Sequence, residues 1–164
     1  MLIAPLPAAN AGPRHEPVTV LVIDDQRAVR EGVARLISCA GMPVGQVRTA
    51  GSAAEALLVA RQCHPEVVVL DVDLDGDDGL ALLPELARAT SVLVLTSHGD
   101  KTTRARALHL GAQCFVEKHQ PAAELLAGVA DLVRRVGEGQ TSWTTRDNCP
   151  AADGRILRGP QNGG

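Results

Sequence analysis

Five polar side chains closely follow short apolar runs in this sequence, and their types suit phosphoryl transfer. Asp24 and Asp25 follow the first run, Asp71 the second, Thr96 the third and Lys118 the fourth. Carboxylates that lie close together repel, so they raise one another's pKa or bind a cation. Oxygen ligands suit Mg²⁺, which keeps several waters and shares a substrate phosphate. An ionised aspartate can attack phosphorus and form an aspartyl-phosphate, while an ammonium and a hydroxyl contact the phosphoryl oxygens.

Each of these residues also has an ordinary structural explanation when it is taken alone. An acidic residue after a strand is often a helix N-cap, a threonine often ends a strand, and a single lysine is usually solvated. The set favours chemistry because several unrelated loops each supply a group suited to the same reaction.

The elements that would position these residues alternate between strand and helix patterns. Apolar and β-branched runs predict five strands, at 18–23, 44–49, 66–70, 91–95 and 113–116. Apolar residues at helical spacing predict five helices, at about 29–40, 52–63, 80–87, 101–110 and 121–136. Pro84 lies in the third of these helices, either in its first turn or at a kink.

Five successive βα units predict a doubly wound α/β fold. The sheet would be five-stranded and parallel, flavodoxin-like, with strand order 2-1-3-4-5 and helices on both faces. Ligands of such folds bind beyond the carboxyl ends of the strands. The polar residues described above would therefore converge on one edge of the sheet.

Four segments carry a family resemblance across residues 18–137. They read VLVIDDQRAVREGVARLI, VVVLDVDLDGDDGLALL, VLVLTS and LGAQCFVEKHQPAAELLAGV. Together they resemble the response regulator receiver domains of two-component systems, and most of all the receivers that usually precede a helix-turn-helix output domain. The resemblance implies a phosphoprotein of signal transduction that switches a partner-binding surface.

The resemblance also implies a role for each matched residue. Asp71 would accept a phosphoryl group from a histidine kinase or a histidine phosphotransfer protein. Mg²⁺ would be held by Asp24, Asp25, Asp71 and the backbone carbonyl of Asp73. The domain would not be an enzyme, beyond phosphorylating and dephosphorylating itself.

The remaining matched residues would bind the phosphate and respond to it. Thr96 would move toward the phosphate, and Lys118 would bind it. Phe115 falls at the aromatic switch position, although strand packing explains it equally well. Asp73 and His98 would tune the phosphate lifetime, with the sign left open.

Two positions depart from the family pattern, and both lie near the site. Asp75 stands where the family usually has proline, and His119 follows Lys118 where proline is common. Neither change removes a chemical group. Asp77 and Asp78 add further negative charge close to the acceptor loop.

Two other functions remain open from the sequence. A haloacid-dehalogenase-like phosphohydrolase would use Asp71, Asp73, Thr96 and Lys118, but it would need a further acidic pair after the lysine. A phosphorylation-independent, receiver-like binding module would need none of these groups. An EF-hand is excluded because its twelfth loop position, which requires glutamate, is Leu82.

Composition narrows the location and the partners. The net charge of −3 gives no support for nucleic-acid binding, and no apolar run reaches the roughly 18 residues of a membrane span. We expect a cytoplasmic protein with a flexible leader at 1–17, a disordered tail at 138–164 and neither an output domain nor direct DNA binding. A natural stand-alone receiver, a truncated longer regulator and a homodimer all remain open.

The family pattern also indicates two docking surfaces. The kinase would dock around residues 26–30, where Arg27 and Arg30 lie. The unknown downstream protein would bind the face of the fourth helix, fifth strand and fifth helix, which includes residues 104–109 and Arg134.

Overall fold

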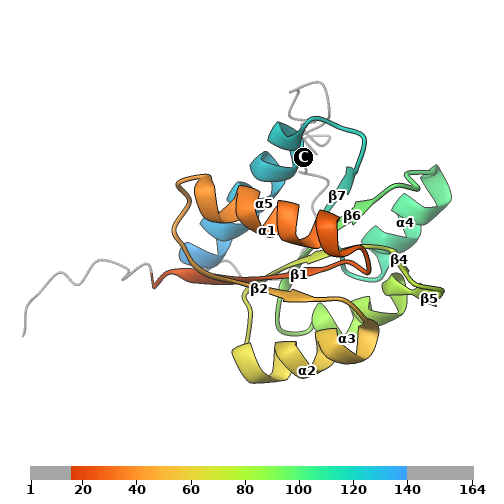
Figure 1. Ribbon diagram of the computed structural model, residues 1–164, viewed down its shortest axis with the longest axis horizontal. Helices are drawn as coiled ribbons and strands as arrows, with labels where there is room; N and C mark the ends of the chain where they lie inside the picture. The colour runs from red at the N-terminus through yellow and green to blue at the C-terminus, as the bar shows by residue number, and fades with distance from the viewer. Residues whose placement is uncertain (1–15, 140–164) are drawn as a thin grey trace, which may run out of the picture.

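A five-stranded parallel sheet forms the centre of the molecule (Figure 1). The computed structural model describes residues 16–139, so the predictions for residues 1–15 and 140–164 lie outside its described part. The strands are β1 (Val18–Ile23), β2 (Val44–Ala50), β3 (Val67–Leu70), β6 (Ser91–Thr96) and β7 (Cys114–Glu117). Their order is β2-β1-β3-β6-β7, which confirms the predicted order 2-1-3-4-5.

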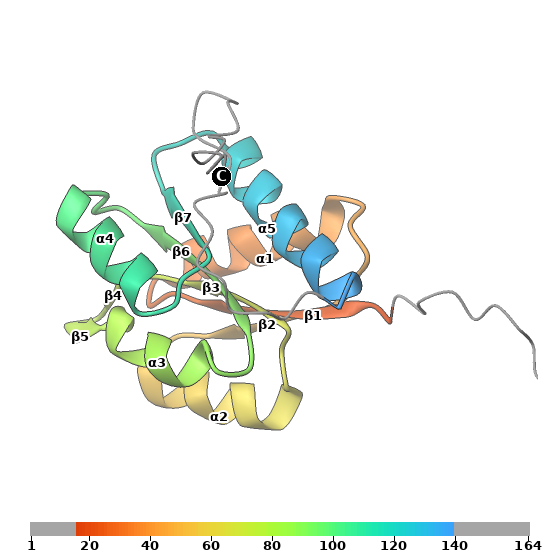
Figure 2. The same cartoon turned by 180° about the vertical axis from the view of Figure 1, so that it is seen from behind.

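Helices cover both faces of this sheet, as Figures 1 and 2 show from opposite sides. They are α1 (Arg27–Cys39), α2 (Ala53–Cys63), α3 (Leu83–Leu86), α4 (Lys101–His109) and α5 (Ala122–Gly137). Buried side chains of α1 and α5 share one apolar cluster, and those of α2, α3 and α4 share the other. The molecule therefore has three layers, with the sheet in the middle.

The first strand shows why the predicted strands are continuous apolar runs. Leu21 and Ile23 pack into the cluster with α2, α3 and α4, whereas Val20 and Val22 pack into the cluster with α1 and α5. All four side chains are at most 2% exposed. A strand that is covered on both faces needs apolar residues at every position.

Local signals set the ends of two helices. The Ser52 hydroxyl accepts from the backbone N–H of Glu55 at 3.2 Å, which makes Ser52 the N-cap of α2. The Glu55 carboxylate reaches back to the N–H of Gly51 at 2.7 Å. Pro84 lies in the first turn of α3, where its missing N–H costs nothing. The predicted helix over 80–87 is accordingly divided into a 3₁₀ turn, Gly79–Leu82, and the short α3.

A small hairpin that the sequence analysis did not predict follows β3. Its strands are β4 (Asp73–Leu74) and β5 (Asp77–Asp78), and they pair antiparallel. Asp75 and Gly76 connect them with φ values of 52° and 87°. Two consecutive positive φ angles are typical of a type I′ turn, for which Asp-Gly is a preferred sequence. Proline cannot adopt positive φ, so this turn accounts for Asp75 at the position where proline was expected.

Candidate functional site

Three aspartates meet at the carboxyl edge of the sheet. Asp24 and Asp25 follow β1, and Asp71 follows the neighbouring β3. One carboxylate oxygen from each residue lies within 4.8 Å of the others. Asp24 and Asp71 are 2% and 4% exposed, and Asp25 is half-buried. The structure therefore brings together the three carboxylates that the sequence predicted to be metal ligands.

Lys118, the residue that follows β7, also contacts this cluster. Its Nζ lies 2.7 Å from Oδ2 of Asp24 and 2.9 Å from Oδ2 of Asp71. The backbone N–H of Lys118 donates to the carbonyl of Thr96 at 2.8 Å, so the pairing of β6 and β7 continues one step into the loop. Parallel pairing of four adjacent strands, β1, β3, β6 and β7, thus delivers the ammonium to the carboxylates.

Burial and charge shift the pKa values of the central pair. Burial raises the pKa of the Asp71 carboxyl above its ordinary value, and Lys118 offsets only part of this effect. Burial disfavours the charged form of Lys118, but hydrogen bonds to Asp24 and Asp71 outweigh that effect, so the Lys118 pKa is raised. The ammonium therefore stays charged, whereas Asp71 holds a proton more readily than an exposed aspartate.

Thr96 and Phe115 occupy adjacent strands beside the cluster. Thr96 is fully buried at the end of β6, and its Oγ1 accepts from the backbone N–H of His98 at 3.1 Å. Phe115 is 4% exposed and packs in the core cluster with α4, while the guanidinium carbon of Arg104 lies 5.5 Å from the centre of its ring. Both predicted switch residues thus have inward side chains. The His98 side chain is exposed.

The acceptor loop is shaped by contacts that the sequence analysis missed. The N–H of Asp73 donates to Oδ1 of Asp71 at 3.3 Å, and its own side chain is exposed. Gly79 donates to the carbonyl of Val72 at 2.6 Å, and a Cβ at this position would overlap the carbonyl oxygen of Asp71. Only glycine fits here. The Asp-Gly pair formed by residues 78 and 79 was the available sequence signal for a tight loop.

Three further contacts tie neighbouring elements to the site. The N–H of Gln26 donates to Oδ1 of Asp24 at 2.9 Å, and Arg30 Nη1 donates to the Asp24 carbonyl at 2.7 Å. Arg106 on α4 lies 2.7 Å from Oδ2 of Asp78 in the hairpin. The hairpin and α4 lie side by side in both Figure 1 and Figure 2. The contact between Gln26 and Asp24 is local, whereas the pairing of Arg106 with Asp78 depends on the fold and could not be indicated by spacing in the sequence.

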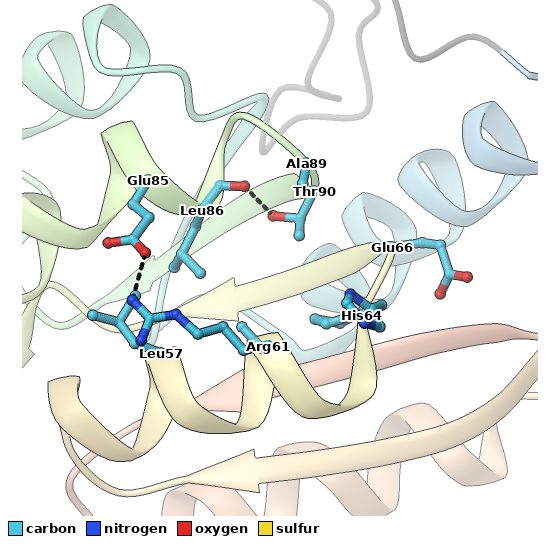
Figure 3. A pocket seen from close by; sticks show the side chains of 10 residues that line it. Leu57, Arg61, His64, Glu66, Glu85, Leu86, Ala89 and Thr90 are labelled. Carbon is cyan, nitrogen blue, oxygen red and sulfur yellow. Dashed lines mark hydrogen bonds and ion pairs between the residues drawn. The ribbon is translucent and has the colours of Figure 1, made fainter.

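A cavity of about 300 Å³ lies at the opposite end of the sheet, between α2 and α3 (Figure 3). Pro65, which precedes β3, lines it, whereas Asp71 follows that strand. The cavity is largely apolar, and some of its polar groups already have hydrogen-bond or ion-pair partners. Arg61 pairs with Glu85 at 3.1 Å, and the Thr90 hydroxyl donates to a backbone carbonyl at 2.8 Å. The cavity therefore takes no part in the acidic site.

The fold and the site define a doubly wound α/β domain with an acidic cluster and a lysine at the carboxyl edge of its sheet. Residues 20–130 match the model of the response regulator receiver domain family. The chain belongs to this family, as the sequence resemblance predicted. Receiver domains of this family interact with histidine kinases. Among residues 16–139, no helix is both long and apolar enough to cross a membrane.

Individual relatives agree with this assignment. The transcriptional regulatory protein FixJ of Azorhizobium caulinodans is 39% identical over 130 residues, which cover 76% of this chain and 60% of that protein. The signal receiver domain of NarL from Mycobacterium tuberculosis superposes with a TM-score of 0.66 and 32% identity, covering 73% of this chain and 98% of the other.

A third relative was crystallised in a modified state. It is a response regulator from Burkholderia pseudomallei with a phosphorylated aspartic acid, a calcium ion and citrate. Its TM-score is 0.63 at 28% identity, covering 75% of this chain and 72% of that one. The alignments with the curated regulators span between 50% and 60% of the lengths of those proteins.

Proposed function

We propose that this receiver domain accepts a phosphoryl group on Asp71 from the phosphohistidine of a histidine kinase or a histidine phosphotransfer protein. The observation that carries the proposal is the position of Lys118, whose Nζ lies 2.9 Å from Oδ2 of Asp71 inside a cluster of three carboxylates. A buried aspartate, a fixed ammonium and a cation-binding set of oxygens are the groups that phosphoryl transfer to a carboxylate requires.

The donor set fits Mg²⁺. Asp24, Asp25 and Asp71 offer three carboxylate oxygens within 4.8 Å of one another, and hard divalent cations prefer oxygen ligands. The backbone carbonyl of Asp73 is our candidate for a fourth protein ligand. When bound, Mg²⁺ supplies positive charge that offsets the charge of the carboxylates and of the phosphoryl oxygens.

The side chains divide the remaining work. An oxygen of ionised Asp71 forms the new bond to phosphorus, the bond between phosphorus and the histidine nitrogen breaks, and the imidazole leaves with that electron pair. The ammonium of Lys118 then pairs with a phosphoryl oxygen instead of with Asp71. The hydrogen bond from the His98 N–H to the Thr96 hydroxyl breaks, and the hydroxyl turns toward the phosphate. The ring of Phe115 then moves in response. Asp73 and His98, whose side chains are exposed, tune the lifetime of the phosphate.

The Burkholderia relative supports this proposal, because it holds a phosphorylated aspartic acid together with a divalent cation. The output of the present chain is proposed in general terms only. Phosphorylation changes the surface of α4, β7 and α5, around residues 104–109 and Arg134, and so changes the binding of a protein partner. The kinase side docks near Arg27 and Arg30 at the start of α1.

Intact mass spectrometry tests the proposal directly. The protein is incubated with Mg²⁺ and a small acyl phosphate, and it is compared with Asp71→Asn. We expect the mass of one phosphoryl group to be added to the native protein only, and only when Mg²⁺ is present. A folded protein that acquires no phosphoryl group from the acyl phosphate or from any phosphorylated kinase would overturn the proposal. Steady release of phosphate from monoesters would favour the phosphohydrolase instead.

A further inference from the structure

Gly99 lies in the loop between β6 and α4, and its backbone conformation does not require glycine. Within residues 16–139, the glycines with positive φ are Gly41, Gly76, Gly111 and Gly139. Gly99 is not among them, so an alanine could adopt its backbone angles. What distinguishes this position is the space around its α-carbon.

The side chain of Glu117 takes that space. A Cβ built on Gly99 would overlap Cγ, Cδ and Oε1 of Glu117. The glutamate is the last residue of β7, and its side chain is 28% exposed. It lies against the Gly99 α-carbon, where a side chain of residue 99 would otherwise point. Gly99 belongs to the loop that follows β6, whereas Glu117 ends β7 and directly precedes Lys118 of the acidic site.

Glu117 is fixed on its own side of this contact. Its N–H donates to Oε1 of Gln120 at 3.0 Å, and its carbonyl accepts from the Gln120 N–H at 3.0 Å. Its Oε2 lies 3.2 Å from Nε2 of His119. The next residue along the chain is Lys118, which is held by two aspartates. The two hydrogen bonds with Gln120 fix the backbone of Glu117, and the contact with His119 orients its carboxylate.

The loop that Glu117 contacts is held by hydrogen bonds at its two ends. At one end, the N–H of His98 donates to Oγ1 of Thr96 at 3.1 Å. At the other end, Asp100 caps α4 by accepting from the N–H of Thr103 at 2.9 Å. Gly99 lies between these anchors. A side chain pressed against Gly99 therefore restrains the segment that carries the bond from His98 to Thr96.

We propose that Glu117 is a positioning residue, which holds the loop at residues 97–100 in its resting place and thereby keeps the Thr96 hydroxyl bonded to His98. The inference rests on the proposed function, because the resting place matters only if Thr96 must turn toward a phosphate. Removing the Glu117 side chain frees the loop and shifts the equilibrium toward the arrangement that phosphorylation selects. A two-state element responds in this way to any contact made in only one of its states.

A double-mutant cycle tests the contact itself. Gly99→Ala introduces the Cβ that collides with Glu117, and Glu117→Ala removes the obstacle. Because the Glu117 carboxyl group is the end of a flexible side chain and can turn away, we expect Gly99→Ala to lower the urea midpoint only modestly in the native background. In the Glu117→Ala background we expect no such loss. Gly32→Ala is the matched control, since a Cβ at Gly32 meets nothing within 4 Å. Its effect should be the same in both backgrounds. An equal loss from Gly99→Ala in both backgrounds would overturn the proposal.

Hydrogen exchange of the His98 amide tests the positioning role without phosphate. We expect Glu117→Ala to speed exchange of this amide about tenfold or more, while amides of β3 change only with global stability. Glu117→Gln keeps the shape of the side chain and should exchange like the native protein. Unchanged exchange in Glu117→Ala would show that the contact only fills space, and would sink the proposal even if the cycle shows coupling.

The rate of phosphoryl transfer from an acyl phosphate gives the functional readout. We expect Glu117→Ala to be phosphorylated several-fold faster than the native protein, because the cost of moving the loop is lower. An unchanged rate would contradict the link to switching. If no variant and no native protein accepts a phosphoryl group, the proposed function fails, whereas the double-mutant cycle and the His98 exchange still decide the role of Glu117 in the loop.

Discussion

Lys118 and Asp71 form an ion pair of 2.9 Å across 47 positions of the sequence. The exposed fractions of their side chains are 16% and 6%, so both charges are largely removed from water. Removing one partner of a buried pair leaves the other uncompensated, which costs more than the pair itself contributes. Here Asp24 provides a second partner for the lysine, so Lys118 keeps a carboxylate partner when Asp71 is replaced.

Asp71→Asn is therefore expected to stabilise the fold at pH 7, by about 1 kcal/mol on the usual scale of single substitutions. Burial raises the pKa of Asp71 above the ordinary value of 3.8, so the folded state holds the proton more tightly than the unfolded state. The stability that this group contributes is complete below the unfolded pKa, and is lost as the pH rises through the folded pKa. The advantage of the variant should accordingly appear as the pH rises from about 4 to 7.

Urea denaturation between these pH values measures this difference. Asp73→Asn is the control, because its side chain is exposed in the same loop and should change stability by less than about 0.5 kcal/mol. A loss of stability in Asp71→Asn at every pH would show that the Lys118 ion pair outweighs the burial of the carboxylate.

Mg²⁺ should raise the melting temperature of the native protein and should do so far less for Asp25→Asn. A ligand that binds only the folded state stabilises it in proportion to the logarithm of its concentration above Kd. Asp25 is the most exposed of the three carboxylates, so its replacement removes a ligand with the least damage to the core. Thermal melts with MgCl₂ are compared with melts in NaCl of equal ionic strength. Equal shifts in the two proteins would mean that Mg²⁺ binds elsewhere.

The sequence predicted the sheet because β1, β3 and β6 are unbroken apolar runs, which few other environments permit. It also predicted the convergence of Asp24, Asp71 and Lys118, since the ends of parallel strands share one edge. The hairpin after β3 was not predicted, because its strands of two residues are too short to show a period. Only the Asp75–Gly76 pair signalled it.

Contacts between elements were equally inaccessible from the sequence. The pairing of Arg106 with Asp78 and the packing of Glu117 on Gly99 depend on how separate elements of the chain approach each other in space. A glycine that is needed for space looks the same in a sequence as a glycine that is needed for a turn. The spacing of residues fixes which side chains share an edge, but not which of them touch.

Gly79→Ala should destabilise the domain by about 2 kcal/mol or more. Its Cβ would overlap the carbonyl oxygen of Asp71, and backbone atoms cannot move aside as the end of a flexible side chain can. The phosphoryl acceptor loop would have to shift, so phosphorylation should slow as well. Urea denaturation and intact mass measure the two effects. Gly32→Ala in α1 should instead be neutral or stabilising, and a neutral Gly79→Ala would contradict the loop geometry.

Asp75→Pro should open the hairpin, although proline is the residue expected there from the family pattern. The φ angle of Asp75 is 52°, whereas the proline ring locks φ near −65°. We expect a loss of about 1 kcal/mol or more, while Asp75→Gly, which suits positive φ, should be neutral or stabilising. Denaturation of the two variants side by side measures the difference. Equal stability of Asp75→Pro and Asp75→Gly would show that the turn can change type without cost.

Arg104→Ala should loosen the ring of Phe115. The guanidinium carbon lies 5.5 Å from the ring centre, and such a contact contributes about 0.5–1 kcal/mol. Phe115 is the single phenylalanine of the chain, so selective labelling gives one set of ring signals in NMR spectra. We expect faster ring flips in Arg104→Ala. Arg106 lies on the same helix but pairs with Asp78, so Arg106→Ala is the control and should leave the rate of ring flips unchanged. Equal effects of the two variants would mean that α4 as a whole, rather than Arg104, holds Phe115 in place.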